Sequence, residues 1–539
     1  MKKLVIWLIL LTCILLLNAC KTKSEEPEPI DPNAWKVVYD IEETSQDFLD
    51  NVHTCYQIFP YAFADSNDDG VGDLNGITEN LNYLAETLNV TCVWLNPIHP
   101  SPSYHKYDVT DYYSIDQQFG TMSDFEALLS EADRLGIRIL MDLVINHTSS
   151  QHPMFINSSI GPAATYRDYY VWNDLSDRTK FPDSTGWYQK NSSYYFASFW
   201  SEMPELNFDN PKVREEIKNI LTFWLNKGVD GFRIDAAKHL YDTKEYPIGT
   251  GTLKENTNYF REFNHHVKTL NSDAFVLGEI YTIGSSYVSN YLEGMDSVFN
   301  FEFADTVIKA LNQNNALSLA DKMRVIREDY IEKRTNPIDS LFLSNHDQNR
   351  VANQLFFDMD KMKLAAHILL TFPGISWIYY GEELGMSGVK PDENIRQPFK
   401  WGDELDQYTV SGDGRIGSWD THNTSLDGMT EQLLDQNSLL QVYIELIALR
   451  NTYDFLSKGL VEEFNSPKST VLTYRLVFDD QTYLVIHNFG NILESITHQF
   501  ISHDLLYTSN GSTINNDIIE LSPYGSMIIQ IPENIISFS

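Results

Sequence analysis

Eight apolar runs rich in β-branched and aromatic residues recur along this chain, and most neighbouring runs are separated by one segment with helical periodicity. Near-continuous apolar runs indicate strands covered on both faces, and the alternation of strands with helices indicates a parallel sheet. Eight such units predict an α/β fold, a (β/α)8 TIM barrel. The predicted strands lie within residues 55–63, 90–98, 137–147, 229–236, 274–281, 295–303, 339–347 and 375–383.

Two regions depart from this alternation. Between His147 and about Val213 the chain is rich in Ser, Asn, Asp, Pro and aromatic residues without clear periodicity, which predicts an insertion domain after the third strand. After a long apolar helical stretch, short alternating strands such as "STVLTYRLVF" predict a C-terminal antiparallel β-sandwich. The expected domains are an insertion at 148–207, a barrel at 36–147 and 208–457, and a sandwich at 458–539.

The N-terminus has the pattern of an export signal. A basic "MKK" is followed by the apolar stretch "LVIWLILLTCILLL" and then by "LNAC", which resembles a bacterial lipobox. The residues after Cys20 are Pro-rich and charged, as in an extended tether. We therefore expect a lipoprotein signal peptide at 1–20 and a tether at 21–35. The mature protein would be exported and held on the cell surface or in the periplasm, with membrane contact only through its N-terminal lipid anchor.

The cysteine count is small. Cys13 would leave with the signal peptide and Cys20 would be acylated, so only Cys55 and Cys92 would remain as thiols. Both lie in apolar strand contexts, which favours buried free cysteines over a disulfide framework.

The net charge limits the partners. With 39 Lys and Arg against 75 Asp and Glu, the chain carries a formal charge of -36, and such a surface repels nucleic acid and anionic headgroups. We therefore expect no nucleic-acid partner and a neutral substrate.

Polar residues gather where the predicted strands end. In "GFRIDAAKH", Arg233 and Asp235 share one face of a strand, because successive side chains alternate. Taken alone, this pair could be a structural ion pair. However, Glu279 lies near the end of the fifth run and Asp347 ends the seventh, with His147 and His346 at strand ends as well. Active sites of such barrels lie at the carboxyl ends of the strands, so this set predicts a catalytic site.

These motifs resemble those of a known family. "DLVINH", "GFRIDAAKH", "GEI" and "SNHD", in this order and spacing, are similar to the α-amylase family of retaining glycoside hydrolases, and so are "SYHKYDVTDYY", "MPELNFDNP" and "KPDENIRQP". The resemblance implies that Asp235 is the nucleophile, Glu279 the general acid/base and Asp347 the stabiliser of the transition state. It further implies these substrate-binding residues: His105, His147 and His346 on one glucose unit, Tyr107 stacking on it, Asp392 and Arg396 at the next unit, and Lys238 and His239 on the leaving-group side.

The physical chemistry of the motifs agrees with these roles. A retaining glycosidase needs one ionised and one protonated carboxyl group. We expect Arg233 to keep Asp235 ionised by lowering its pKa. The apolar run around Glu279 is expected to raise the pKa of that carboxyl group by desolvation.

A calcium loop is a second expectation. In "DSNDDGVGD" the oxygen donors Asp65, Asn67, Asp69, the Val71 carbonyl and Asp73 fall at alternate positions, as in the first part of an EF-hand loop. The twelfth position is glycine, so no EF-hand is present, and a solvated acidic turn is the alternative. The family resemblance favours Ca²⁺ here. A further family calcium site would use Asn146 and the His239 carbonyl, but Glu205 stands where the family has aspartate.

The sequence therefore predicts an α-amylase that cleaves internal α-1,4 bonds of starch-like α-glucan oligo- or polysaccharides. The alternatives are an α-glucosidase, a neopullulanase-like debranching enzyme or a transglycosylase of the same family. A non-catalytic surface glucan-binding lipoprotein is a further alternative, and the intact set of carboxylates argues against it.

Overall fold

The computed structural model describes residues 38–173, 186–242, 253–402, 408, 410–411, 414–498, 503–515 and 517–531. The predicted signal peptide and tether lie outside the described residues. Within these ranges, no helix has the length and apolar character that a membrane span requires.

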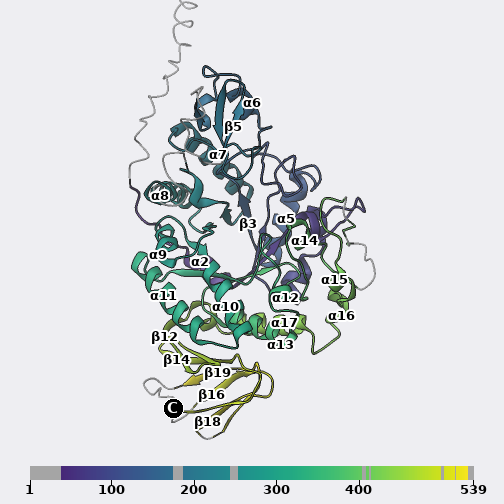
Figure 1. The fold of residues 1–539 in the computed structure, drawn as a ribbon, viewed down its shortest axis with the longest axis vertical. Helices are drawn as coiled ribbons and strands as arrows, with labels where there is room; N and C mark the ends of the chain where they lie inside the picture. Colours follow the sequence, from purple (N-terminus) through teal and green to yellow (C-terminus); the bar gives the residue numbers. More distant parts are fainter. Residues whose placement is uncertain are drawn as a thin grey trace, which may run out of the picture.

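A closed parallel barrel forms the centre of the molecule (Figure 1). Its strands lie in the spatial order β1-β11-β10-β9-β8-β7-β3-β2, and each predicted apolar run contributes one of them. The (β/α)8 prediction is therefore confirmed. The barrel strands are β1 (Thr54–Ile58), β2 (Cys92–Leu95), β3 (Arg138–Leu143), β7 (Gly231–Ile234), β8 (Phe275–Gly278), β9 (Ser297–Phe299), β10 (Ile338–Phe342) and β11 (Ile375–Tyr379).

Helices cover the outside of the barrel, and local sequence signals set their ends. For example, Thr121 and Asp124 form a capping box at the start of α5, and Gly136 ends that helix in the left-handed conformation. The longer helices are α5 (Met122–Leu135), α7 (Pro211–Lys227), α8 (Leu253–Leu270), α10 (Phe301–Gln313), α11 (Leu317–Lys333), α13 (Met359–Thr371) and α17 (Leu439–Thr452). Shorter ones include α2 (Gln46–Asn51), α4 (Leu74–Glu79), α6 (Pro153–Ser158), α12 (Val351–Gln354), α14 (Asp392–Ile395) and α18 (Phe455–Lys458).

The segment between β3 and α7 is an insertion with its own small antiparallel sheet. This sheet has the order β4-β6-β5, with β4 (Trp172–Asn173), β5 (Trp187–Lys190) and β6 (Ser193–Phe196). An isolated bridge from His147 to Glu205 connects the two ends of the insertion, and a second bridge joins Tyr170, within the insertion, to Leu206. The insertion therefore starts and ends beside the carboxyl end of β3.

The C-terminal part is a β-sandwich. Its larger sheet has the order β12-β13-β14-β19-β16 and its smaller sheet the order β15-β18-β17, and all these pairs are antiparallel. Buried residues of both sheets, such as Ile486 and Ile519, share one core. The strands are β12 (Leu460–Lys468), β13 (Val471–Phe478), β14 (Gln481–Asn488), β15 (Glu494–Thr497), β16 (Asp504–Thr508), β17 (Thr513–Asn515), β18 (Ile518–Leu521) and β19 (Ser526–Ile531).

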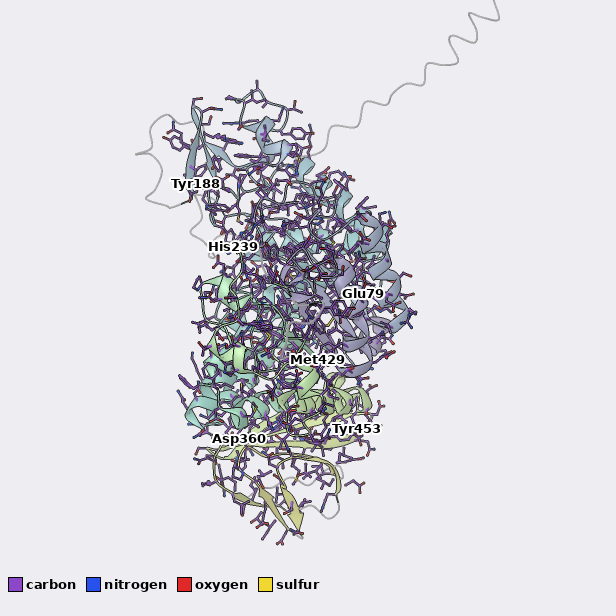
Figure 2. The ribbon with its side chains drawn as sticks, turned by 90° about the vertical axis from the view of Figure 1, so that its right-hand side faces the viewer. Glu79, Tyr188, His239, Asp360, Met429 and Tyr453 are labelled. Carbon is purple, nitrogen blue, oxygen red and sulfur yellow. A yellow bond between two sulfur atoms is a disulfide. The ribbon has the colours of Figure 1, made fainter. Side chains whose placement is uncertain are left out.

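The insertion and the sandwich lie at opposite ends of the molecule (Figures 1 and 2). In Figure 2, Tyr188 of the insertion is near one end, while Asp360 and Tyr453 lie toward the sandwich. His239 lies on the insertion side of the barrel. The two ends of the barrel therefore have different neighbours.

The expectation for the cysteines was half wrong. Cys55 and Cys92 are fully buried, as expected, but they form a disulfide rather than remaining free. They are register partners on the adjacent strands β1 and β2, and their Cα atoms are 4.3 Å apart. The pairing follows from the strand register, because it brings together two residues that are 37 positions apart in the sequence.

Candidate active site

A cavity of about 570 Å³ opens at the carboxyl end of the barrel. The insertion contributes Phe199, Trp200 and Met203 to its wall. The barrel loops contribute most of the predicted site residues: His105, Tyr107, His147, Asp235, Lys238, His239, Glu279, Asp347, Asp392 and Arg396. The structure thus brings together residues that are up to 291 positions apart, from His105 to Arg396.

Two predicted residues, Arg233 and His346, do not line this cavity. Their side chains are 1% and 0% exposed, so they lie behind the wall formed by the other residues. The resemblance predicted that His346 hydrogen-bonds the sugar directly. In the structure its contacts are instead with the groups that form the wall.

The strands place the first two carboxylates next to each other. Asp235 directly follows β7 and Glu279 directly follows β8, and these strands are paired in register. Ala236, in the left-handed conformation with φ 48°, donates its backbone N–H to Glu279 Oε2 at 3.0 Å. The bend after β7 therefore fixes the carboxyl group that follows β8.

Arg233 is the centre of the charged cluster. Its Nη1 contacts Asp142 Oδ1 at 2.8 Å and Asp235 Oδ1 at 2.9 Å, and its Nη2 contacts Glu279 Oε2 at 2.9 Å. One guanidinium can bridge Asp235 and Glu279 only if the two carboxyl groups lie side by side. Asp142 belongs to β3 and is the register partner of Arg233 on β7.

Burial has a larger effect than Arg233 on the protonation of Asp235 and Glu279. The pKa of Asp235 is raised above its usual value by burial, and Arg233 only partly offsets this shift. The expected net lowering was therefore wrong, because the sequence does not reveal how completely the loops cover the site. The pKa of Glu279 is also raised by burial, as expected, with Arg233 again opposing. Burial raises the pKa of Asp142 to about 7.

Asp347 has the opposite electrostatic environment. Burial acts to raise its pKa, but His346 and Arg396 outweigh this and hold the pKa well below the usual range. Asp347 Oδ2 is 2.9 Å from His346 Nε2, and Oδ1 is 2.9 Å from Arg396 Nη2. Arg396 also contacts Asp392 Oδ2 at 3.2 Å. Asp347 therefore stays ionised across the neutral range.

His346 is oriented from both sides of its ring. The Gln57 amide Nε2 lies 2.7 Å from Nδ1, and an amide nitrogen can only donate. Nδ1 of the neutral ring must therefore accept, which leaves the proton on Nε2, where it points to Asp347. The Tyr107 hydroxyl is also 2.7 Å from Nε2 and donates to Asp142 Oδ2 at 3.0 Å.

The remaining predicted side chains form the rest of the wall. Burial lowers the pKa of both His105 and His147 to about 4, so both rings are neutral at neutral pH. Lys238 donates from Nζ to the carbonyl of Tyr281 at 2.7 Å, and His239 Nδ1 contacts Asp242.

Sequence reasoning missed two groups of residues. Asp142 and Gln57 contact the predicted residues directly. Both lie inside predicted strands, so only the strand register identifies them as part of the site. Trp200 and Tyr281 line the cavity with exposed rings, 48% and 64% accessible. Their positions close to the motifs "MPELNFDNP" and "GEI" were the available sequence signal.

The predicted calcium loop is a series of turns closed by hydrogen bonds to its own side chains. Asp65, Asn67 and Asp69 each accept a hydrogen bond from the backbone N–H two residues on. The Asp65 and Asp73 carboxylates are almost fully buried, and no lysine or arginine pairs with either among the described residues. In the described ranges, no group of three or more His, Cys, Asp or Glu side chains is placed so that it could hold a metal ion. An ion in this loop would therefore also need Asn67 and the Val71 carbonyl as ligands. This all-oxygen donor set fits Ca²⁺.

The region around Asn146 also contains buried oxygens without partners. Within the described residues, neither Asn146 Oδ1 nor Asp242 Oδ1 has a hydrogen-bond partner. Both side chains act on the buried carboxyl group of Glu205, whose pKa is raised by burial to about 8. These oxygens would suit a cation that prefers oxygen ligands.

Comparisons with known proteins identify the family of this chain. A family model described as the α-amylase catalytic domain matches residues 57–459, and one described as the C-terminal domain of the α-amylase SusG matches residues 471–528. α-Amylase 3 of Dictyoglomus thermophilum is 41% identical, covering 88% of this chain and 93% of that protein. The 4-α-glucanotransferase of Thermotoga neapolitana is 32% identical, covering 81% and 95%. The crystal structure of an α-amylase from H. orenii superposes with a TM-score of 0.81 at 35% identity, covering 89% of this chain and 99% of that one. The chain belongs to the α-amylase catalytic domain family and is a glycoside hydrolase of that family.

Proposed function

We propose that the enzyme cleaves internal α-1,4 bonds of α-glucans by double displacement, with retention of configuration. The observation that carries this proposal is the bridge from Arg233 to both Asp235 and Glu279 on the wall of an open cavity. A retaining glycosidase needs two carboxyl groups about 5–5.5 Å apart, and a shared guanidinium keeps them close.

In the first step the Asp235 carboxylate attacks the anomeric carbon of the sugar. The bond to the leaving oxygen breaks as Glu279 donates its proton to that oxygen. The raised pKa of Glu279 suits a group that must be protonated before this step. The product is a covalent glycosyl-enzyme and a shortened glucan.

In the second step Glu279, now ionised, removes a proton from water. The water oxygen attacks the anomeric carbon and the ester bond to Asp235 breaks, which restores both carboxyl groups. Asp347 remains anionic because of His346 and Arg396, so it stabilises the positive charge that develops on the sugar in both steps.

The leaving-group side of the cavity supports endo cleavage. Tyr281 lies two positions after Glu279 and, with Lys238 and His239, lines the cavity beside the acid. These side chains would contact glucose units beyond the cut, so that binding energy from remote units orients the scissile bond. The 41% identical relative named α-amylase 3 also favours this activity.

Transfer to a sugar acceptor is the second candidate, because a relative at 32% identity is named a 4-α-glucanotransferase. Hydrolysis and transfer use the same carboxyl groups, and they differ in whether water or a sugar hydroxyl attacks the glycosyl-enzyme.

The first prediction concerns the cleavage pattern. The enzyme should cut a maltooligosaccharide blocked at its non-reducing end, and longer chains should react faster than maltose. Chromatography of the reaction products tests this prediction, with Asp235→Asn as the inactive control. An intact blocked substrate together with fast hydrolysis of maltose or isomaltose would instead indicate an α-glucosidase, and products longer than the substrate would indicate transfer.

The second prediction concerns Arg233. In Arg233→Lys a single ammonium cannot bridge both carboxyl groups, so the pKa values of Asp235 and Glu279 should rise. The nucleophile must be ionised, so the acidic limb of the kcat/KM profile should move to higher pH. We also expect kcat to fall by about a hundredfold or more.

The matched control is Arg138→Lys, at an arginine that pairs with Asp47 and Asp230 at the start of β3. Its pH profile should be that of the wild type. An unchanged acidic limb and near-normal kcat in Arg233→Lys would show that the bridge does not set the protonation of the nucleophile.

We further propose that the loop from Asp65 to Asp73 binds Ca²⁺, supported by its buried carboxylates and all-oxygen donor set. Those residues would hold the ion, which would neutralise the loop. Chelation should then lower the melting temperature by about 5 °C, because an ion that binds only the folded state stabilises it.

The metal prediction has a matched pair of variants. Asp65→Asn should remove the effect of the chelator, while Asp68→Asn, in the same loop but outside the alternating donor set, should keep it. Metal analysis of the purified protein gives an independent readout. If the chelator leaves the melting temperature unchanged and the purified protein contains no calcium, this loop is a solvated turn that binds no metal.

We also propose export with lipidation at Cys20, supported by the basic, apolar and lipobox-like segments of the N-terminus. Cys20→Ser should release the protein from the membrane fraction, because the polar tether has no affinity for lipid. Cys13→Ser, within the predicted signal peptide, should remain membrane-bound. Retention of the Cys20→Ser protein after signal cleavage would contradict the lipid anchor.

A further inference from the structure

A buried lysine in a left-handed bend separates two side chains of the active-site wall. Lys106 lies between His105 and Tyr107, and its φ of 65° falls in the left-handed region. Lysine rarely adopts this conformation, and residues held in such strained conformations gather at functional sites. Lys106 is 2% exposed and is not among the described residues that line the cavity, whereas both neighbours are. Any effect of Lys106 on a substrate must therefore pass through its neighbours.

The ammonium group of Lys106 is anchored within the loop that joins β2 to α5. Its Nζ contacts Asp116 Oδ2 at 2.7 Å and donates to Gln118 Oε1 at 2.8 Å. Asp116 is itself fixed, because its carboxylate accepts from the backbone N–H groups of Ser101 at 3.2 Å and Gln118 at 2.9 Å. The two charged side chains are only 2% and 10% exposed, so removing either partner is costly. This anchor opposes relaxation of the bend at Lys106.

The bend fixes the orientation of both neighbours. The Tyr107 backbone N–H donates to His105 Nδ1 at 3.1 Å, across Lys106. A backbone amide can only donate, so Nδ1 of the neutral His105 ring accepts and the ring proton is on Nε2. The Tyr107 hydroxyl reaches Asp142 at 3.0 Å and His346 at 2.7 Å. The bend thus sets the tautomer of one wall residue and places the other in the buried network.

The backbone of Tyr107 also holds a third residue of the wall. Its carbonyl oxygen lies 3.1 Å from His147 Nε2, and a carbonyl can only accept a hydrogen bond. His147 therefore donates from Nε2 to this carbonyl. Because His147 belongs to the loop after β3, the bend at Lys106 connects two loops of the barrel. Three side chains that line the cavity, those of His105, Tyr107 and His147, thus depend on one backbone conformation.

We propose that Lys106 is a positioning residue for the reaction, which holds its loop in the bend that presents His105, Tyr107 and His147 to the sugar. Its buried pair with Asp116 offsets the strain of the left-handed conformation. The proposal rests on the proposed function, because these three side chains would contact the glucose unit at the cleaved bond. A purely structural ion pair would change the melting temperature alone, whereas a positioning residue also changes kcat.

The test compares Lys106→Ala with Lys106→Gly on a chromogenic maltooligoside. Both variants lose the ammonium group, so they differ mainly in how readily residue 106 adopts the left-handed conformation. Lys106→Gly should therefore have a kcat about tenfold higher than that of Lys106→Ala, with a much smaller difference in KM. The assays are run below the melting transition of every variant, so that incomplete folding does not affect the comparison.

A double-mutant cycle tests the anchor without changing the residue at the bend. Asp116→Asn removes the negative partner of Lys106 and should lower kcat by about fivefold or more. In the Lys106→Gly background the same substitution should change kcat by less than about twofold, because glycine adopts the bend without an anchor. This comparison decides the question even if the Lys106→Ala chain does not fold.

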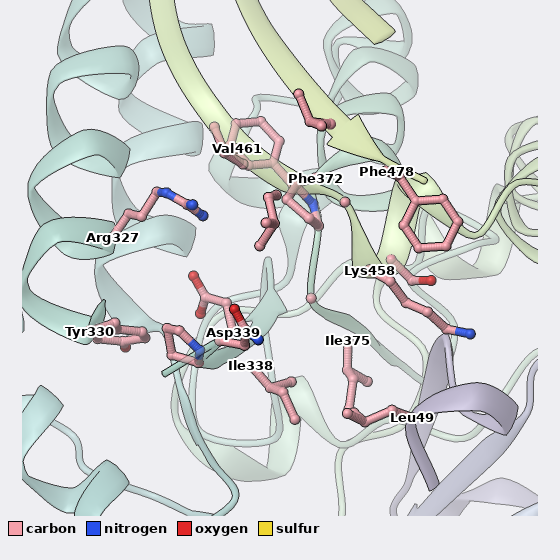
Figure 3. Close-up of a pocket in the computed structure, with 18 of the residues that line it drawn as sticks. Leu49, Arg327, Tyr330, Ile338, Asp339, Phe372, Ile375, Lys458, Val461 and Phe478 are labelled. Carbon is pink, nitrogen blue, oxygen red and sulfur yellow. The ribbon is translucent and has the colours of Figure 1, made fainter. Parts of the chain in front are cut away.

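A remote residue in the same backbone conformation controls for strain alone. Asp480 has a φ of 60° in the two-residue turn between β13 and β14. It lines a separate cavity, together with Phe478, at the end of the barrel where β10 and β11 begin (Figure 3). Asp480→Ala should lower the melting temperature relative to Asp480→Gly, while both variants keep the wild-type kcat.

The outcomes separate this inference from the proposed function. Equal kcat values for Lys106→Ala and Lys106→Gly, whether near the wild-type value or far below it, would overturn the positioning role. An Asp116→Asn loss of the same size in both backgrounds would also overturn it. Failure of the wild type to cut a blocked maltooligosaccharide would instead overturn endo cleavage and leave the Lys106 comparison intact.

Discussion

One buried guanidinium organises the catalytic end of this molecule. Arg233 is 1% exposed and contacts three carboxyl groups, those of Asp142, Asp235 and Glu279. A single positive charge cannot compensate three negative charges in a buried site, so at least one of these groups is favoured in its protonated form. A retaining glycosidase needs such a mixture of one ionised and one protonated carboxyl group. Removing one partner of a buried ion pair typically costs about 3–5 kcal/mol, so the cluster contributes to both the stability and the chemistry of the barrel.

The barrel determines whether this cluster can form. Arg233 meets Asp142 because β7 pairs with β3 in a register that puts the two residues opposite each other, and it meets Glu279 because β8 follows on the other side. A shift of one residue in either pair would turn the side chains to the other face. The loops after the strands, together with the insertion, then cover the site and raise the carboxyl pKa values by burial.

Features that depend on a local pattern could be predicted from the sequence, whereas features that depend on strand register or burial could not. The eight strands could be predicted because apolar runs and helical periodicity are local, and Asp235, Glu279 and Asp347 could be named because each lies at or near the end of its run. The Cys55–Cys92 disulfide and the Asp142–Arg233 pair depend on which residues face each other across neighbouring strands. The net rise in the pKa of Asp235 depends on how completely distant loops exclude water, and composition gives no measure of that.

The third carboxylate is coupled to the other two through hydrogen bonds. Asp142 accepts from the Tyr107 hydroxyl, this hydroxyl contacts His346, and His346 contacts Asp347, so a continuous path runs from Arg233 to Asp347. Groups in such a network polarise one another, and their substitutions do not act additively. The ring of His346, fixed by Gln57 with its proton on Nε2, transmits this coupling without contacting the open cavity. The protonation of the nucleophile, the acid and the stabiliser is therefore a property of the whole buried network, and no single residue sets it alone.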